Sequence, residues 1–199
     1  MGTKEKLVQN LSRWGQFNIL AELRQVHSCN VITINTPEEF GFLSKEADAY
    51  VTAQSGIALA IRTADCYPLL FWDPLEKVIG AAHSGREGTR LNIGEATIQA
   101  MQALGAKDIQ AAIGPGISGE KYQVDEHIWQ KFVDSTGIAQ NFPFLDLRKV
   151  INAQLINSGI KKEHIFHQEI CTFSDHNYYS YRRDQTSERQ YSFIIFGVH

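Results

Sequence analysis

The sequence predicts an α/β (α+β) fold, in which helices separate groups of β-strands. Two apolar runs, at residues 67–72 and 78–82, have the length and composition of buried strands, and Asp73 with Pro74 marks a break between them. From residue 88 to residue 104 the apolar side chains instead recur at the i, i+3, i+4 spacing of a helix. Because strand-like and helix-like segments alternate along the chain, a mixed fold class is expected.

The other expected elements follow the same two periodicities. Strands are expected at residues 20–27, 31–35, 108–113 and 191–198, where apolar and β-branched residues run together or alternate. Helices are expected at residues 4–14, 125–133 and 146–158, and Gly159 supplies a stop for the last of them. Residues 36–45 are expected to form a loop or a short helix, and residues 178–189 a loop rich in tyrosine and arginine.

Length and composition narrow the class of protein. We expect one domain over residues 1–199, because the chain is long enough for a single substantial core. The net charge of −3 gives no basic surface for nucleic acid, and no apolar run approaches the roughly 18 residues that cross a membrane. The first residues do not resemble a signal peptide, and the cysteines show no disulfide spacing, so a reducing cytoplasm is the expected setting. Composition does not predict an oligomeric state.

The region around Cys66 and His83 carries the strongest chemical pattern. Cys66 begins one strand-like run and His83 ends the next, so pairing of the two strands would bring a thiol beside an imidazole. Such a pair suits a soft metal ion or a nucleophile. Buried cysteines, however, are most often small hydrophobic core residues. The local pattern therefore leaves the core, ligand and nucleophile interpretations open.

Further motifs stand on both sides of this region. T-A-D-C-Y-P occupies residues 63–68, and A-A-H-S-G-R-E-G-T occupies residues 81–89. The others are Q-V-H at 25–27, A-D-A-Y-V-T at 47–52, I-G-P-G-I at 113–117, Y-Q-V at 122–124, C-T at 171–172 and S-Y-R-R-D at 180–184. In this order they resemble the motifs of the YfiH family, whose members are named laccase-domain protein, polyphenol oxidase or purine nucleoside phosphorylase.

The resemblance implies a fold and an activity. The implied architecture is a layered sandwich of mixed β-sheets flanked by helices. The implied activity is that of a zinc enzyme that takes a purine nucleoside and phosphate, cleaves adenosine, methylthioadenosine or inosine by phosphorolysis, and deaminates adenosine. His27, Cys66 and His83 are the implied zinc ligands. Three protein ligands would leave a fourth position for water, as in other catalytic zinc sites.

Candidate residues surround the implied metal. Cys66, Asp65 and Arg182 are the candidate catalytic residues, and Arg62, Arg183 and Arg86 are candidates for binding substrate or phosphate. In a regular strand Asp65 would point away from Cys66 and be structural, whereas a bulge or turn would remove that objection.

The chain departs from the family pattern at several positions. The family reads H-A-G-W-R-G where this chain has Arg86 and Glu87 at the Trp and Arg positions, and it has cysteine where this chain has Gly116. The section before Q-V-H is shorter, with Arg13 as a remnant of a T-R-x-G-G motif or no counterpart at all. If the arginine of the family motif binds phosphate, Glu87 in its place would repel it, and weaker phosphorolysis or a different substrate is then expected.

Other functions stay open at this point. An amidase acting on a cell-wall precursor falls within the same family, and a non-catalytic relative would keep the fold for binding. A copper oxidoreductase is suggested by the laccase names, because two histidines and a cysteine also bind copper. Multicopper sites need more ligands, commonly in H-x-H pairs, and the seven histidines here form none. Cys66 acting as a metal-free nucleophile, with His83 or His27 as its base, is the remaining alternative.

Overall fold

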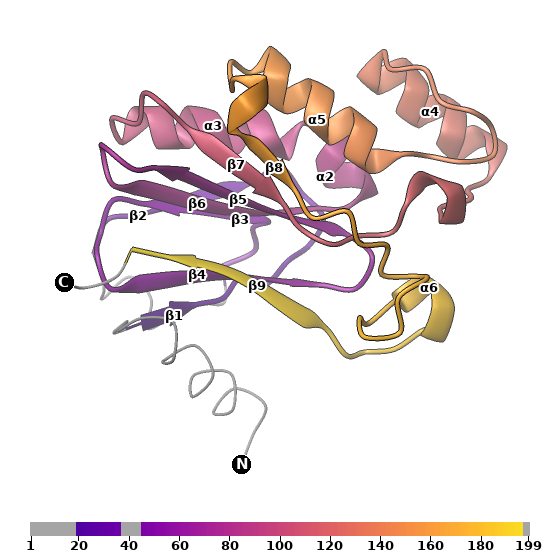
Figure 1. Ribbon diagram of the computed structural model, residues 1–199, viewed down its shortest axis with the longest axis horizontal. Coiled ribbons are helices and arrows are strands. Elements are labelled where there is room, and N and C mark those ends of the chain that lie inside the picture. The colour runs from indigo at the N-terminus through magenta and orange to yellow at the C-terminus, as the bar shows by residue number, and fades with distance from the viewer. Residues whose placement is uncertain (1–18, 37–44, 197–199) are drawn as a thin grey trace.

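A computed structural model describes residues 19–36 and 45–196, and confirms a mixed α and β fold built on two β-sheets (Figure 1). The smaller sheet has the order β1-β4-β9, formed by Ile19–Ala21, Ile57–Thr63 and Gln190–Ile195. The larger has the order β2-β3-β6-β5-β7-β8, formed by Val31–Ile34, Ala49–Thr52, Val78–Ser84, Tyr67–Asp73, Gln110–Ile113 and Ile165–His167. Both sheets combine parallel and antiparallel pairs, as the family resemblance implied.

The elements stack as three layers. Helices α3 (Ile93–Ala103), α4 (Glu126–Thr136) and α5 (Leu147–Asn157) lie on one side of the six-stranded sheet, and the three-stranded sheet lies on the other (Figure 1). The short helices α2 (Arg86–Arg90) and α6 (Tyr181–Asp184) follow β6 and precede β9. Two 3₁₀ turns, at Gly119–Lys121 and Lys162–His164, complete the described elements. No helix in the described ranges is long and apolar enough to cross a membrane.

Strand β6 shows why the middle sheet forms. All of its residues are buried, and neighbouring side chains serve two separate hydrophobic clusters. Val78 and Ala82 pack toward the helices, whereas Ile79 packs toward the three-stranded sheet. A strand covered on both faces needs an apolar residue at every position, so its sequence does not alternate. Burying each large aliphatic side chain contributes roughly 1.5–3 kcal/mol to folding.

Several boundaries differ from the sequence-based expectations. The helix expected at residues 88–104 is two helices, because Asn92 adopts a left-handed conformation (φ 59°) and its side chain accepts a hydrogen bond from the Glu95 N–H. The strand expected at residues 20–27 ends at Ala21, and His27 lies in a turn with φ 61°. The loop expected at residues 178–189 contains α6. The helix expected at residues 4–14 lies outside the described residues.

Strand register places the chemically important residues together. In the β5–β6 pair His83 stands opposite Pro68, so Cys66, just before β5, lies beside the end of β6. In the β3–β6 pair Ala82 stands opposite Ala49, and the His83 N–H donates to the Asp48 carbonyl at 2.7 Å. The pairing expected from the two apolar runs therefore does bring the thiol and the imidazole to one edge of the sheet.

Candidate metal centre

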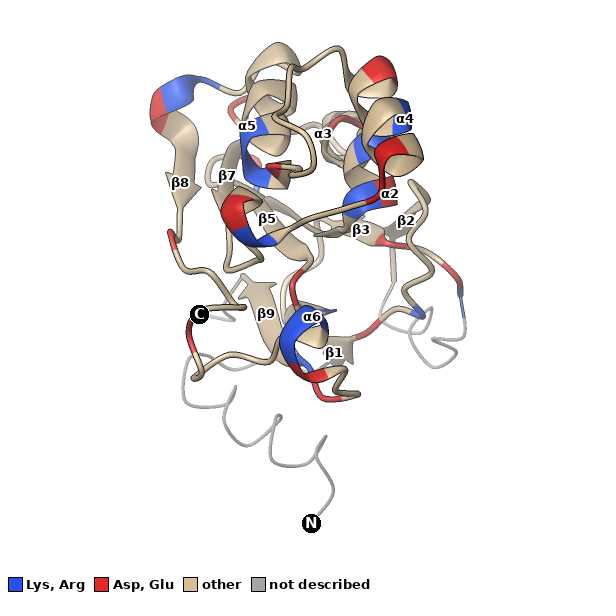
Figure 2. Cartoon of the chain, turned by 90° about the vertical axis from the view of Figure 1, so that its right-hand side faces the viewer, with Lys and Arg blue, Asp and Glu red and all other residues tan. Residues whose placement is uncertain are grey.

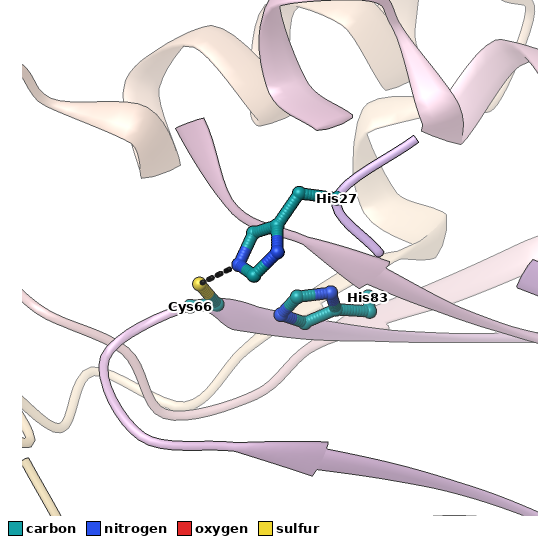
Figure 3. A group of neighbouring side chains, drawn as sticks. All are labelled: His27, Cys66 and His83. Atoms are coloured by element: carbon teal, nitrogen blue, oxygen red, sulfur yellow. Dashed lines mark hydrogen bonds between the residues drawn. The ribbon is translucent and has the colours of Figure 1, made fainter. Parts of the chain in front are cut away.

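His27, Cys66 and His83 form one cluster, with their ligand atoms all within 4.8 Å of one another (Figure 3). His27 comes from the turn before β2, Cys66 from the turn before β5 and His83 from β6. The Cys66 sulfur lies 4.0 Å from His27 Nε2, and the two imidazole rings meet edge to face with centroids 4.8 Å apart. Residues far apart in the sequence thus present one thiol and two imidazoles to a common point.

The donor set and its spacing fit a tetrahedral metal ion. With metal–sulfur and metal–nitrogen bonds of about 2.3 and 2.0 Å, tetrahedral ligand atoms stand about 3.5 Å apart. The Cys66 sulfur and His27 Nε2 are 4.0 Å apart and the ligand atoms of the cluster all lie within 4.8 Å of one another, so binding would draw the side chains closer together. Gly85 keeps the space clear, because a Cβ there would lie 2.8 Å from the Cys66 sulfur and 3.0 Å from His27 Cδ2. The cluster can therefore bind a metal ion.

Asp48 is the support that both histidines share. Its buried carboxylate lies 2.8 Å from His83 Nδ1, and because a carboxylate only accepts, the proton is on Nδ1 and Nε2 is left as the ligand atom. The same carboxylate accepts the backbone N–H of His27 at 3.0 Å and that of Ser28 at 2.6 Å, which fixes the turn that carries His27. Burial alone would raise the pKa of Asp48, but the hydrogen bonds from His83 and Ser28 outweigh it and hold that pKa at about 2.

Sequence reasoning did not assign a role to Asp48. It lies within the motif A-D-A-Y-V-T, which contributes to the family resemblance without indicating a role for the aspartate. The available signal was an aspartate immediately before an apolar strand, because a buried carboxylate needs hydrogen-bond donors nearby. Which donors those are depends on the β3–β6 register, and no local pattern shows it.

The thiol and the buried imidazole polarise each other. Burial raises the pKa of Cys66, but the His83 charge and the hydrogen bond with His27 more than offset it, to about 6. Burial lowers the pKa of His83, whereas the Cys66 charge and the Asp48 hydrogen bond raise it, to about 9. Each shift favours the charged form of its group, and the thiolate is the form of cysteine that binds metal.

Asp65 occupies a turn, not a regular strand position. Its φ of 84° places it in the left-handed region between β4 and β5. Its carboxylate accepts the Thr172 hydroxyl at 2.7 Å and the Arg182 backbone N–H at 2.7 Å, which anchors the start of α6 beside Cys66. These contacts make Asp65 a positioning residue for the C-terminal segment. Its catalytic role stays a prediction.

The cluster lines a cavity of about 570 Å³, and the predicted arginines differ in their relation to it. Arg62 lines the cavity together with Tyr181 and with Arg189, the last residue of the expected tyrosine- and arginine-rich loop. Arg182 donates to the Gln123 carbonyl at 2.7 Å and stacks over the Tyr122 ring.

Arg183 is held by its own neighbourhood. Its guanidinium donates to the carbonyls of Thr172, Phe173 and Tyr178 and to the Asp184 carboxylate. These bonds hold the loop before α6 in place, so Arg183 has a structural role within the motif S-Y-R-R-D.

Arg86 and Glu87 face a different cavity, of about 220 Å³, which also includes His127 on α4. The Glu87 carboxylate lies 2.9 Å from Arg90 Nε and 3.6 Å from Arg86 Nε. Burial raises the pKa of Glu87, but the Arg90 contact more than offsets it and lowers that pKa. The carboxylate expected to repel phosphate is thus paired with arginine and does not line the cavity of the cluster.

The replacement of a family cysteine by Gly116 has a local physical reason. A Cβ at this position would lie 2.7 Å from ring atoms of Tyr67, which fills the space. The Tyr67 hydroxyl donates to the Ile117 carbonyl at 2.7 Å, so the ring is fixed where it is. A thiol at residue 116 would require the Tyr67 ring to move.

Figure 2 shows basic and acidic positions together on α6 and on the helices above it. This is in keeping with the net charge of −3.

Comparison with known proteins gives consistent relatives. The purine nucleoside phosphorylase of Deinococcus radiodurans is 42% identical over 172 residues, covering 82% of this chain and 64% of that protein. A purine nucleoside phosphorylase of Streptomyces griseus is 34% identical over 179 residues, covering 86% of this chain and 72% of that protein. The chain therefore spans less than two thirds of the length of the Deinococcus relative.

Solved structures agree with the sequence matches. YlmD from Geobacillus stearothermophilus superposes with a TM-score of 0.83 at 27% identity, covering 96% of this chain and 78% of that one. The YfiH protein of Bacillus licheniformis gives a TM-score of 0.79, also at 27% identity, over 87% of this chain and 73% of that one. The model of the family described as multi-copper polyphenol oxidoreductase laccase matches residues 3–197. The chain therefore belongs to that laccase-domain family, and the YfiH and YlmD structures are similar to it in fold.

Proposed function

We propose that this protein is a zinc-dependent enzyme that cleaves purine nucleosides with phosphate. The observation that carries the proposal is the His27–Cys66–His83 cluster at the wall of a nucleoside-sized cavity, in a chain whose relatives are named purine nucleoside phosphorylase. Adenosine, methylthioadenosine and inosine are the proposed substrates, and deamination of adenosine is a proposed second reaction at the same site.

The chain's own residues would divide the work as follows. Asp48 keeps the proton on His83 Nδ1, so that Nε2 stays a ligand atom. Tyr181, in the cavity and about half exposed, offers an aromatic face on which a purine can stack. When bound, zinc would supply a Lewis acid and an activated water, the chemistry that deamination at the purine C6 requires.

Phosphorolysis needs no redox change. A phosphate oxygen forms a bond to the ribose C1′ while the bond from C1′ to the purine N9 breaks, and the purine leaves with the proton that N9 takes up. The protein must therefore bind phosphate near the nucleoside and keep water from competing. A partly enclosed cavity of about 570 Å³ can hold both substrates.

Copper is the second metal that this donor set accepts, and the family description favours testing it. Two imidazoles and a thiolate are also blue-copper ligands, but a multicopper oxidase holds further copper ions on additional histidines. Within the described ranges, the structure groups metal-binding side chains only at this cluster. Oxygen uptake with a phenol by the copper-loaded protein would favour the oxidoreductase over the nucleoside enzyme.

The proposed activity is tested by metal removal. We expect the zinc-loaded protein to release adenine from adenosine only when phosphate is present, with ribose 1-phosphate as the second product. Exhaustive chelation should abolish the reaction, and added zinc should restore it. Coupled detection of both products checks this. Full activity after chelation, or adenine release that is independent of phosphate, would contradict the proposal.

The role of Asp48 predicts a selective loss of metal affinity. Asp48→Asn places an amide NH₂ against N–H donors and removes the charge that holds His83 Nδ1, so zinc affinity should fall roughly ten- to a hundredfold. Asp73→Asn is the matched control: Asp73 is also buried, has a pKa of about 2 and accepts backbone N–H groups, but at the opposite end of β5. Competition with a chromophoric chelator measures both affinities. Equal losses in the two variants would show that Asp48 acts only through stability.

The pKa of Cys66 predicts how its alkylation depends on pH. In the metal-free protein the thiolate fraction should rise through pH 6, well below the range of an ordinary cysteine, because the Cys66 pKa is lowered. Zinc should block the reaction at every pH until a chelator removes it. Peptide mapping separates Cys66 from Cys171, whose pKa is also lowered, to about 7, through Ser118. Rapid Cys66 alkylation in the zinc-loaded protein would favour the nucleophile interpretation.

A further inference from the structure

We propose that Arg62 and Arg189 together form the phosphate subsite of the cavity that contains the metal cluster. This inference rests on the proposed function and deepens it, because it names the residues that make the reaction depend on phosphate. Of the arginines expected from sequence to bind substrate, only Arg62 lines this cavity, and Arg189 joins it from the position just before β9.

The β4–β9 pair brings Arg62 and Arg189 to the same end of the smaller sheet. In the antiparallel β4–β9 pair Arg62 stands opposite Tyr191. The ladder ends at the Thr63–Gln190 pair, and Arg189 is the residue just before β9, so both arginines stand at this end of the pair and line the same cavity. Two guanidinium forks that line one cavity can converge on one tetrahedral oxyanion.

The donors of Arg189 are oriented and available. Its Nη1 donates to the carbonyls of Thr186 at 2.8 Å and Glu188 at 2.7 Å, which fixes the plane of the guanidinium. Among the described residues none accepts a hydrogen bond from its Nε or Nη2, so both can donate to a ligand. A fork that is already oriented loses less conformational entropy when it binds an anion.

The position of Arg62 is fixed through its backbone. The Gln25 side chain accepts from the Arg62 N–H at 3.0 Å and donates to the Arg62 carbonyl at 2.8 Å, which holds the end of β4 beside the cavity. Glu22 and Arg62 both lie near enough to Tyr191 to influence its pKa, but Glu22 does not line the cavity. The described residues that line it include two arginines and no carboxylate, so its electrostatic potential favours an anion.

The arginines can be tested without relying on activity. Binding of inorganic phosphate to the zinc-loaded protein, measured by calorimetry without nucleoside, should weaken roughly ten- to a hundredfold in Arg62→Gln and Arg189→Gln. Arg189→Lys keeps the charge but not the fork, and should lose less. The KM for phosphate should rise in parallel, whereas zinc content and the KM for adenosine should stay within about twofold of the wild type.

Arg24→Gln is the matched control, because Arg24 is exposed, pairs with Glu46 at 3.1 Å and lies outside the cavity. Phosphate affinities that are equal in Arg24→Gln, Arg62→Gln and Arg189→Gln would overturn the subsite, and so would a wild-type protein that does not bind phosphate. If Arg189→Gln loses its fold with the loop bonds, Arg62→Gln decides, since those bonds remain. If phosphate binding depends on both arginines but the protein does not cleave nucleosides, the subsite is supported and the proposed function is contradicted.

Discussion

The contact between the Asp48 carboxylate and His83 is the interaction on which the rest of the site depends. One buried carboxylate accepts hydrogen bonds from His83 Nδ1 and from the backbone of the turn that carries His27. Hydrogen bonds to a charged group contribute roughly 1.5–3 kcal/mol each, and leaving such a carboxylate buried without them would be strongly unfavourable. The orientation of two metal-binding side chains is therefore tied to the stability of the fold.

The same dependence links the site to the sheet. Asp48 stands next to His83 only because β3 pairs with β6 in the observed register, and Cys66 reaches them only because β5 pairs with the other edge of β6. The three-stranded sheet supplies another part of the cavity wall. Arg62 lies on its strand β4, and Arg189 lies just before its strand β9. Asp65 joins the two regions by holding both the turn before Cys66 and the start of α6. The cavity thus lies where the two sheets meet, and each sheet supplies part of it.

Sequence reasoning predicted the parts of this arrangement that local patterns encode. The fold class, most of the strands and the helices at α4 and α5 follow from hydrophobic periodicity. The break at Asn92 was missed because apolar spacing continues through it, while a single left-handed residue ends one helix and caps the next. The candidate metal ligands could be proposed from sequence only through the family resemblance, because the segments before β2 and β5 are not linked by any short spacing.

Long-range contacts account for what the sequence could not show. Arg183 and Arg62 are both arginines within or next to family-like motifs, and residue type alone does not distinguish them. In the structure the Arg183 guanidinium donates to three backbone carbonyls, whereas Arg62 lines the cavity. Glu87 looks repulsive in the motif, yet Arg90 one helical turn later pairs with it. Such outcomes depend on which partner the fold brings near, and they cannot be inferred from residue type alone.

The central claim is that Cys66, His27 and His83 hold one zinc ion in the native protein. X-ray absorption at the metal edge of the protein purified without added metal tests it most directly. We predict about one zinc per chain, with one sulfur neighbour near 2.3 Å, two imidazole nitrogens near 2.0 Å and a further light atom from solvent. A first shell without sulfur, stoichiometric copper in place of zinc, or an unchanged spectrum in Cys66→Ala would contradict it.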